Sequence, residues 1–151
     1  MGRTDTGSRV IRASAEKIYA AYLDPQAVAQ WRPPAGMRAE IYSFDARVGG
    51  GYRMAFVYDD ASVLGKTTDH ADVFEGMFVD LVPNERIVER ATFESDDPAF
   101  AGVMTVTTTF RPVAEGTEVT MTCSDVPEGI SAADHADGIA SSLANLAVYV
   151  E

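Results

Sequence analysis

His135 is the side chain of this sequence best suited to chemistry, because of the residues that follow it. Ile139 and Leu143 stand four and eight residues further along, and these spacings bring all three side chains to one face of a helix. A neutral imidazole at the end of an apolar face could orient a ligand hydroxyl or carbonyl, or act as a general base. The alternative is an exposed histidine that packs against its own helix. His135 is therefore a binding candidate and a weaker catalytic one.

Cys123 is the one cysteine of the chain, and its neighbours favour packing over reactivity. It alternates with Val119 and Met121, as the core-facing residues of a strand do, and a free cysteine there behaves as a small apolar side chain. A nucleophilic role, with His70 or His135 as its base, is the alternative. A single cysteine also excludes a disulfide framework.

Metal and phosphate chemistry have little support in the sequence. The two histidines stand 65 residues apart, and Asp-His-Ala-Asp at 134–137 lacks the usual spacing of metal ligands. Three glycines occupy 49–51, but a strand pattern follows them in place of the Lys-Ser/Thr and helix of a phosphate-binding loop. We therefore expect no metal and no cofactor.

The composition is that of an acidic globular domain. Lys and Arg total 12 and Asp and Glu total 23, a formal net charge of −11, within 151 residues of which 46% are hydrophobic. This length predicts a single domain over residues 1–151, with the polar residues 1–7 as a flexible start. The acidic balance argues against nucleic acid and anionic membranes as partners. No apolar run is long enough for a membrane span, and the polar N-terminus lacks a secretory core, so we expect a cytoplasmic protein.

Helix signals come early in the chain. Residues 8–13 form a short strand pattern, and Ser14 is a good N-cap for a helix that follows. Asp24-Pro25 is a stronger start signal, since it combines an N-cap acid with proline at the first helical position. The second helix must end near Trp31, before Pro33-Pro34.

From about Met37 the apolar residues recur with a period of two, which indicates strands. One strand contains Tyr42 and Phe44, and further strands are expected at about 52–58, 72–82, 86–95, 102–111 and 117–124. Residues 59–71 are polar and irregular and predict a mobile loop.

A long C-terminal helix completes the pattern. Ser131 is its expected N-cap, and the apolar residues that follow share one face: Ile139, Leu143, Leu146 and Val150. The only partner surface large enough for this face is a sheet. The sequence thus predicts an α+β fold, a curved antiparallel sheet of about six or seven strands around a long C-terminal helix, with two short helices after the first strand.

Several short motifs resemble landmarks of one family, in the right order: Asp24-Pro25, Trp31–Pro34, Asp45–Gly50, Val82–Val88, Thr107–Val113 and Gly116–Met121. This is the activator-of-heat-shock-protein-90-ATPase-like branch of the START-like, or SRPBCC, superfamily, and the resemblance covers about residues 8–150. It implies a helix-grip fold with a deep apolar cavity between the long helix and the sheet. Members of the superfamily include lipid and polyketide binders and aromatase/cyclases. Eukaryotic co-chaperones of the family carry an extra N-terminal docking domain, and no residues before Ser8 could form one here, so we expect no co-chaperone role.

In such a fold, the inward aromatic, apolar and small side chains either fill a solid core or line a cavity. The small helix residues Ala136, Gly138, Ala140 and Ser142, together with the resemblance, favour a cavity. Polar handles for a ligand would come from His135, Tyr42, Tyr52 and Glu40. The expected cavity residues are Trp31, Tyr42, Phe44, Tyr52, Met54, Phe56, Phe78, Phe93, Met121, Cys123, His135, Ile139 and Leu143.

Trp31 carries a separate expectation. It ends the second short helix, so its indole turns either into solvent or toward the core. We expect it to be buried at the cavity wall, with a polar partner for its single N–H.

These observations lead to three hypotheses of function. The first is binding of a hydrophobic small molecule, aromatic or polycyclic in particular, in the cavity between the sheet and the helix. The second is an enzyme of the cyclase, dehydratase or hydrolase type that uses the same cavity and therefore needs convergent titratable groups. The third is a protein-interaction module that uses the acidic residues 112–151, which contain no Lys or Arg. A homodimer is the open alternative to a monomer.

Overall fold

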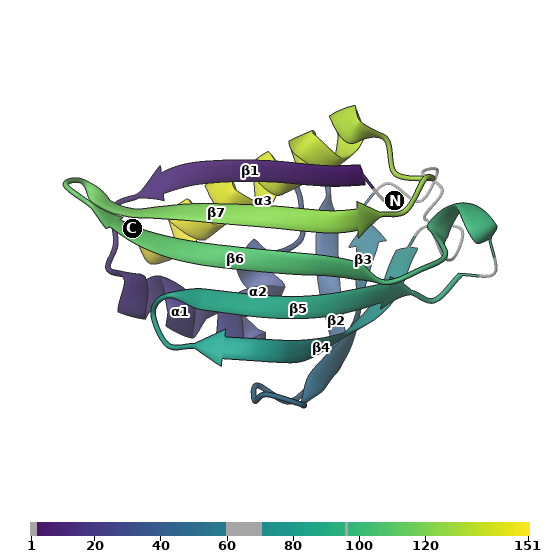
Figure 1. The fold of residues 1–151 in the computed structure, drawn as a ribbon, viewed down its shortest axis with the longest axis horizontal. Helices are drawn as coiled ribbons and strands as arrows, with labels where there is room; N and C mark the ends of the chain where they lie inside the picture. Colours follow the sequence, from purple (N-terminus) through teal and green to yellow (C-terminus); the bar gives the residue numbers. More distant parts are fainter. Residues whose placement is uncertain (1–2, 60–70, 96) are drawn as a thin grey trace.

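Seven strands form one curved antiparallel sheet, and three α-helices cover one of its faces (Figure 1). The computed structural model describes residues 3–59, 71–95 and 97–151. The strands pair in the order β1-β7-β6-β5-β4-β3-β2. Their bounds are β1 Arg3–Ile11, β2 Met37–Phe44, β3 Gly51–Tyr58, β4 Ala71–Val82, β5 Arg86–Phe93, β6 Met104–Val113 and β7 Gly116–Val126. The helices are α1 Ala15–Leu23, α2 Pro25–Trp31 and α3 Ala132–Val150, with a short 3-10 helix η1 at Pro98–Phe100. The predicted α+β helix-grip arrangement is confirmed.

The expected N-caps form in all three α-helices. The Ser14 hydroxyl accepts from the Lys17 amide, the Asp24 carboxylate from the Gln26 amide, and the Ser131 hydroxyl from the Asp134 amide. Each cap satisfies one of the amides that a helix start leaves without an intrahelical partner.

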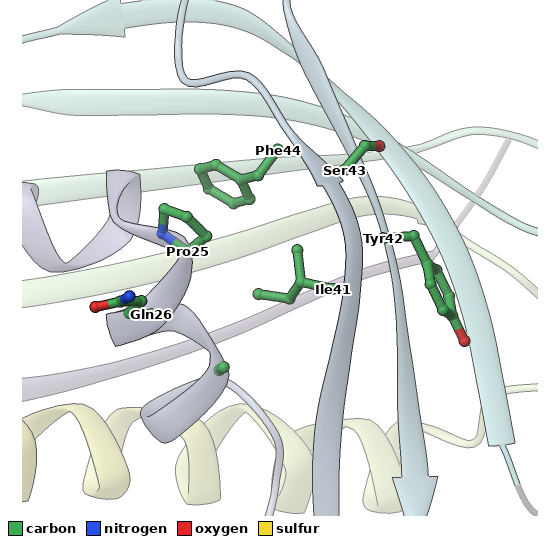
Figure 2. A pocket seen from close by; sticks show the side chains of 7 residues that line it. Pro25, Gln26, Ile41, Tyr42, Ser43 and Phe44 are labelled. Atoms are coloured by element: carbon green, nitrogen blue, oxygen red, sulfur yellow. The ribbon is translucent and has the colours of Figure 1, made fainter.

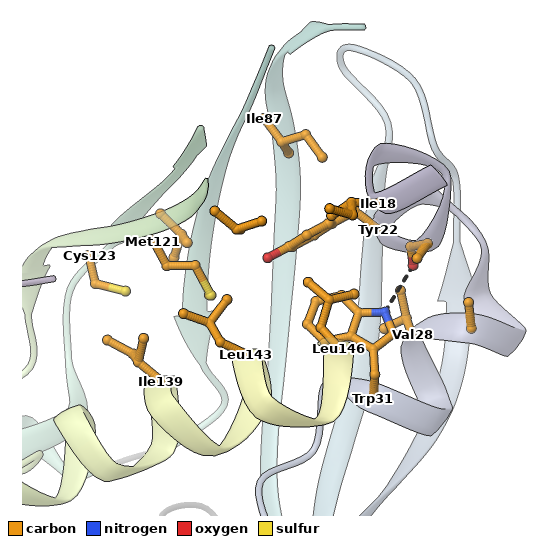
Figure 3. Close-up of a cluster of buried hydrophobic side chains, with 14 of the residues drawn as sticks. Ile18, Tyr22, Val28, Trp31, Ile87, Met121, Cys123, Ile139, Leu143 and Leu146 are labelled. Atoms are coloured by element: carbon orange, nitrogen blue, oxygen red, sulfur yellow. Dashed lines mark hydrogen bonds between the residues drawn. The ribbon is translucent and has the colours of Figure 1, made fainter. Parts of the chain in front are cut away.

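The apolar face of α3 packs against the concave face of the sheet. Ile139, Leu143, Leu146 and Val150 are all buried, and Figure 3 shows the first three pointing toward Met121 and the rest of the core. Gly7 of β1 allows a close approach, because a Cβ at this position would collide with Ile139. The helix is therefore held along β1, the edge strand of the sheet.

The first strand is longer than the sequence predicts. The polar start that we expected to be flexible is part of β1 from Arg3 onward, and Arg3 pairs with Val126 of β7. Arg3, Asp5 and Gly7 occupy the inward positions of this strand. Because none of them is apolar, the sequence does not show the alternation of apolar and polar residues that is typical of a strand.

The second strand contains a bulge that the alternation did not predict. The register with β3 shifts between Ile41 and Ser43, so Ile41 pairs with Met54 and Phe44 pairs with Tyr52. The extra residue leaves two consecutive outward side chains. Tyr42 is accordingly 51% exposed, with the Arg53 guanidinium 4.8 Å from its ring centroid. The expectation that Tyr42 and Phe44 share one face is wrong.

Trp31 is fully buried, as expected, but its place differs from the prediction. Its indole N–H donates to the Ala21 carbonyl at 3.0 Å, and its ring packs edge-on against Tyr22 (Figure 3). The side chain thus fills the core where α1, α2 and α3 meet, and the next residue, Arg32, turns toward the sheet.

The predicted loop at 59–71 falls almost entirely on residues 60–70, which lie outside the described residues. Across the described ranges, no helix is long and apolar enough to cross a membrane.

Replacing Trp31 tests its role in the core. Trp31→Ala should lower the free energy of unfolding by about 3–5 kcal/mol, because a large ring and its hydrogen bond are both lost. The matched control is Tyr149→Ala, which removes a ring that is 43% exposed and should change stability by less than about 0.5 kcal/mol. Urea unfolding followed by circular dichroism measures both. A near-neutral Trp31→Ala would contradict the burial described here.

Candidate functional site

A cavity of about 520 Å³ lies between the concave face of the sheet and the first half of α3. This volume is within the range of small-molecule sites, roughly 300–1,000 Å³. Most of its walls are apolar side chains of the sheet, from β3 to β7, and of α3. They are Phe56, Phe74, Ala91, Phe93, Met104, Val106, Met121, Cys123, Ile130 and Ile139.

A buried ion pair forms one polar end of the cavity, which we call the Arg32 pole. Arg32, at the C-terminal end of α2, donates to both oxygens of Glu89 on β5, at 3.1 and 3.3 Å. The Tyr52 hydroxyl donates to the same carboxylate at 2.8 Å. Glu89 is 0% exposed, while Arg32 and Tyr52 line the cavity. The buried acid is thus satisfied from two sides, as a charge away from water requires.

The ionisation states at this pole follow from burial and charge. Burial disfavours the Arg32 cation, but the adjacent Glu89 carboxylate outweighs burial, and the pKa of Arg32 is raised. Burial, and then the same carboxylate, raise the pKa of Tyr52. Arg32 is therefore a cation and Tyr52 a neutral hydroxyl, and both can donate hydrogen bonds.

Gly76 of β4 makes room for this arrangement. It stands opposite Tyr52 in the β3–β4 register, and a Cβ at Gly76 would collide with the Tyr52 ring. Glycine is thus the residue that lets the ring lie across β4 and reach Glu89.

The segment after α2 ties this pole to α3 through three hydrogen bonds. Ser142 donates to the Arg32 carbonyl at 2.7 Å, Asn145 to the Pro33 carbonyl at 3.0 Å, and the Ala35 amide donates to Ser141 at 2.8 Å. Of the two consecutive prolines, Pro33 receives its hydrogen bond from α3, while the Pro34 carbonyl accepts from the Met37 amide at 3.1 Å. The small polar face of α3 is therefore an intramolecular interface.

The second polar end, the His135 pole, is formed by His135 of α3 and Asp5 of β1. The His135 Nδ1 lies 2.7 Å from an Asp5 carboxylate oxygen, and the two side chains are 15% and 11% exposed. Arg3 donates to both oxygens of Asp5 and to the Ile130 carbonyl. His135 lines the cavity, so it is held in place and is not the exposed side chain of the alternative interpretation.

The rim of the cavity is acidic. Asp134 and Asp137 are exposed on the first turns of α3. Asp72 of β4, which is buried, lines the same cavity near the Tyr58 hydroxyl. These carboxylates outnumber the cations that line the cavity, where Arg32 is already paired with Glu89.

The structure brings about half of the expected cavity residues to the cavity. Seven line it: Tyr52, Phe56, Phe93, Met121, Cys123, His135 and Ile139. Four are buried in the core beside or beneath it and do not line it: Trp31, Met54, Phe78 and Leu143.

Tyr42 and Phe44 lie elsewhere, at an open depression of about 440 Å³ between α2 and β2. Figure 2 shows Ile41 pointing toward α2 while Tyr42 points the other way. Glu40 is exposed and accepts a hydrogen bond from Tyr42, so it does not line the cavity either. The depression is open and contains no buried charged group, and we place the functional site at the larger cavity.

The sequence patterns did not identify Arg32, Glu89 and Asp5 at the two poles, nor Asp72, Asp134 and Asp137 elsewhere on the cavity lining. The sequence does contain a signal for Glu89, because this acid occupies an inward position of its strand between Ile87 and Ala91. A buried carboxylate needs a cation or hydrogen-bond donors as partners. Asp5 gave no such signal, because the residues around it are all polar.

Cys123 lines the cavity as a buried thiol. Burial raises the pKa of its thiol to about 12, so the thiolate is absent near neutral pH. Within the described ranges, no group of three or more His, Cys, Asp or Glu residues could hold a metal ion.

Comparison with known proteins decides the family. A sequence model described as activator of Hsp90 ATPase homolog 1-like protein matches residues 12–151. The chain belongs to this family. No curated protein matches it.

Solved structures agree with this membership of the AHSA1-like family, part of the SRPBCC superfamily. A protein from Chromobacterium violaceum is 34% identical, with a TM-score of 0.87, and the match covers 98% of this chain and 96% of that one. An AHSA1-like protein from Aeromonas hydrophila is 20% identical, with a TM-score of 0.73 and coverage of 98% and 92%. A protein from Rhodobacter sphaeroides is also 20% identical, with a TM-score of 0.74 and coverage of 98% and 93%. The last two likenesses show the fold alone.

The buried ion pair at the Arg32 pole can be tested by a double-mutant cycle. Glu89→Gln should destabilise the protein by about 3–5 kcal/mol, because Arg32 is left charged without its counter-ion. The double variant Arg32→Met/Glu89→Leu should cost much less than the sum of its two single changes. The exposed pair Arg111–Glu118 is the control, and Glu118→Gln should cost under about 1 kcal/mol. Additive single changes at the buried pair would disprove the coupling.

The Asp5 carboxylate should contribute a pH-dependent part of the stability. Its hydrogen bonds from Arg3, and then from His135, lower the pKa of Asp5 in the folded state. A depressed pKa stabilises the fold above the pKa of the unfolded state, about 3.9, and this contribution is lost as the pH falls through the folded pKa.

The stability difference between the wild type and Asp5→Asn should therefore be fully present at about pH 5, above the unfolded pKa, and should shrink as the pH is lowered further, through the depressed pKa of the folded state. Urea unfolding at successive pH values measures it. A difference that stays constant over this range would contradict the depressed pKa.

Proposed function

We propose that this protein binds a neutral, hydrophobic small molecule in the cavity between the sheet and α3. The observation that carries the proposal is a cavity of about 520 Å³ whose walls are mostly apolar and whose few buried polar groups gather at two places. Ligand sites in proteins combine these same features. Folds of the SRPBCC superfamily commonly bind hydrophobic ligands, which supports the same function.

The wall formed by β3, β4 and β5 favours an aromatic or polycyclic ligand. Phe74 packs edge-on against Tyr52, Phe56 and Phe93, with ring centroids 6.2, 4.8 and 6.1 Å apart. Such a wall offers both ring faces and ring edges, which bind another aromatic system beyond simple apolar burial.

The charges around the cavity favour a neutral ligand over an anionic one. The Arg32 cation is compensated by Glu89, while Asp134 and Asp137 lie exposed at the rim. Among the described residues that line the cavity, no unpaired Lys or Arg would compensate an incoming carboxylate, which would meet the like charges of the rim and give up its hydration. Long-chain fatty acids are therefore expected to bind less well than neutral molecules of similar apolar area.

Binding explains this geometry better than a cyclase, dehydratase or hydrolase activity does. Such an enzyme needs titratable groups that converge on a reacting atom. Among the described residues that line the cavity, His135 is the one imidazole, Cys123 stays a thiol, and Arg32 is paired with Glu89.

Filling the cavity is the sharpest test. Ala91 of β5 lines the cavity, so Ala91→Phe should weaken binding of the neutral dye N-phenyl-1-naphthylamine by tenfold or more, since the ring would occupy the site. The matched control is Thr92→Phe, which places the same ring on the neighbouring residue of β5, outside the cavity lining, and should leave the affinity unchanged.

Dye fluorescence and thermal unfolding provide the two readouts. In the wild type, saturation near one dye per chain should raise the stability by mass action, by about 2.7 kcal/mol when the free dye is at a hundredfold excess over its dissociation constant. Equal affinities in Ala91→Phe, Thr92→Phe and the wild type would place the dye elsewhere. A dye that does not bind the wild type would overturn the proposed function.

A further inference from the structure

The two poles lie at opposite ends of a single row of residues across the sheet. In the register, Glu89 of β5 pairs with Val106 of β6, Val106 with Cys123 of β7, and Cys123 with Asp5 of β1. Residues directly opposite one another in neighbouring strands point to the same face, and here that face is the concave one. An acid thus stands at each end of the row, and the two residues between them are apolar and line the cavity.

Each acid is paired with a base that comes from outside the sheet. Glu89 holds Arg32 at the end of α2, and Asp5 holds His135 on α3. Arg32 and His135 both line the cavity. The row therefore positions two different polar groups, a cation and an imidazole, at the two ends of an apolar space.

The hydrogen bond to Asp5 decides which nitrogen of His135 is left to a ligand. Arg3 keeps Asp5 ionised, and a carboxylate only accepts hydrogen bonds, so Nδ1 of His135 must donate. In the neutral imidazole the proton then lies on Nδ1, and Nε2 is an acceptor. Nε2 has no partner among the described residues.

The groups around this imidazole leave its Nε2 without a hydrogen-bond donor. Asp5 and Arg3 face it from β1, Asp134 and Asp137 lie on its own helix, and Cys123 of β7 is a neutral thiol. Arg32 and Asp72 line other parts of the cavity. None of these groups donates a hydrogen bond to Nε2, so a hydroxyl or N–H of a ligand can do so.

The Arg32 pole has the opposite character. Two of the guanidinium N–H groups are used by Glu89, out of the five that arginine carries. The guanidinium also lies 5.7 Å from the centroid of the Tyr52 ring, and the side chain lines the cavity. Because Glu89 already compensates the charge, this pole suits a neutral acceptor such as a ketone oxygen.

The spacing of the poles sets the length of the ligand. Three strand spacings separate Asp5 from Glu89 along the row, roughly 14 Å. Along α3, His135 lies seven residues before Ser142, which bonds the Arg32 carbonyl, a rise of roughly 10 Å. Two aromatic rings end to end, with a polar atom at each end, match this span.

We infer that the ligand of this cavity is a neutral, elongated aromatic molecule with a carbonyl oxygen at one end, bound by Arg32, and a hydroxyl at the other, which donates to Nε2 of His135. This inference rests on the proposed function and specifies the class of ligand. It also gives Asp5 a role as a positioning residue, because the carboxylate sets the tautomer of His135.

Three matched probes test the inference: 4-acetyl-4′-hydroxybiphenyl, 4-acetylbiphenyl and 4-hydroxybiphenyl. Each is titrated against the wild type by displacement of N-phenyl-1-naphthylamine or by calorimetry. The probe with both groups should bind roughly three- to tenfold more tightly than either probe with one group, the value of one neutral hydrogen bond.

Two variants of His135 assign the hydroxyl contact. In His135→Asn the side-chain amide can still donate to Asp5 in place of Nδ1, but nothing replaces Nε2. The advantage of the hydroxyl should disappear, while the affinity for 4-acetylbiphenyl stays unchanged. In His135→Gln the longer amide reaches the position of Nε2 and should restore part of that advantage.

The nitrogen chemical shifts of the His135 ring give a readout that needs no variant. They should show the proton on Nδ1 in the free protein at neutral pH, and the Nε2 shift should change with the hydroxyl probe but not with 4-acetylbiphenyl. A proton on Nε2, or a hydroxyl advantage that survives in His135→Asn, would overturn the inference. So would equal affinities of the three probes, while the proposed function would stand. If no probe binds and the dye also fails to bind, the proposed function itself fails.

Discussion

The buried contact between Arg32 and Glu89 is the constraint on which the rest of this structure depends. It joins the end of α2 to the middle of the sheet through two hydrogen bonds, with Tyr52 completing the acid's partners. The chain that leaves Arg32 is then bound to α3 by Ser142 and Asn145. A charged pair away from water tolerates little displacement, because either partner alone would be costly to bury. The sheet, α2 and α3 therefore share one anchored point.

This anchor also explains how a cavity can persist under a helix that packs closely. The second half of α3 is packed solidly, with Leu146 and Val150 buried, and it lies near the helices and Trp31. Its first half diverges from the middle of the sheet and faces the cavity with Gly138 and Ile139. Two supports hold the helix: the bonds from residues 32–35 toward its second half, and the Asp5–His135 contact near its N-terminus. Between these supports the apolar walls need not touch one another.

The polar groups at the two ends of the cavity are arranged in a similar way, each around a carboxylate of the sheet. Glu89 compensates the Arg32 cation, and Asp5, which is paired with Arg3, orients the His135 imidazole, so the cavity contains directional donors and acceptors at both ends. Hydrogen-bonding groups of this kind select a ligand by the position of its polar atoms, while the apolar walls supply most of the binding free energy. Under the proposed function, the exposed Asp134 and Asp137 at the rim would disfavour an anionic ligand relative to a neutral one.

The sequence by itself determined the order and type of the elements. The signals for these elements are local, because they depend on neighbours within one or two helical turns. They include the N-caps Ser14, Asp24 and Ser131 and the apolar face of α3 that begins at Ile139. The family landmarks added the helix-grip arrangement and the presence of a cavity. Seven of the expected cavity residues, derived from periodicity together with these landmarks, line the cavity.

Only the tertiary structure decided which polar groups meet. Asp5 and His135 are 130 residues apart, and Arg32 and Glu89 are 57 apart, so no local pattern pairs them. The bulge at Tyr42 reversed the face of that residue, and the turn of α2 placed Arg32 at the cavity instead of Trp31. Periodicity in the sequence indicates which face of a helix or strand is apolar. The partner of a buried charge depends instead on strand register and helix placement, and these arise only when distant segments pack together.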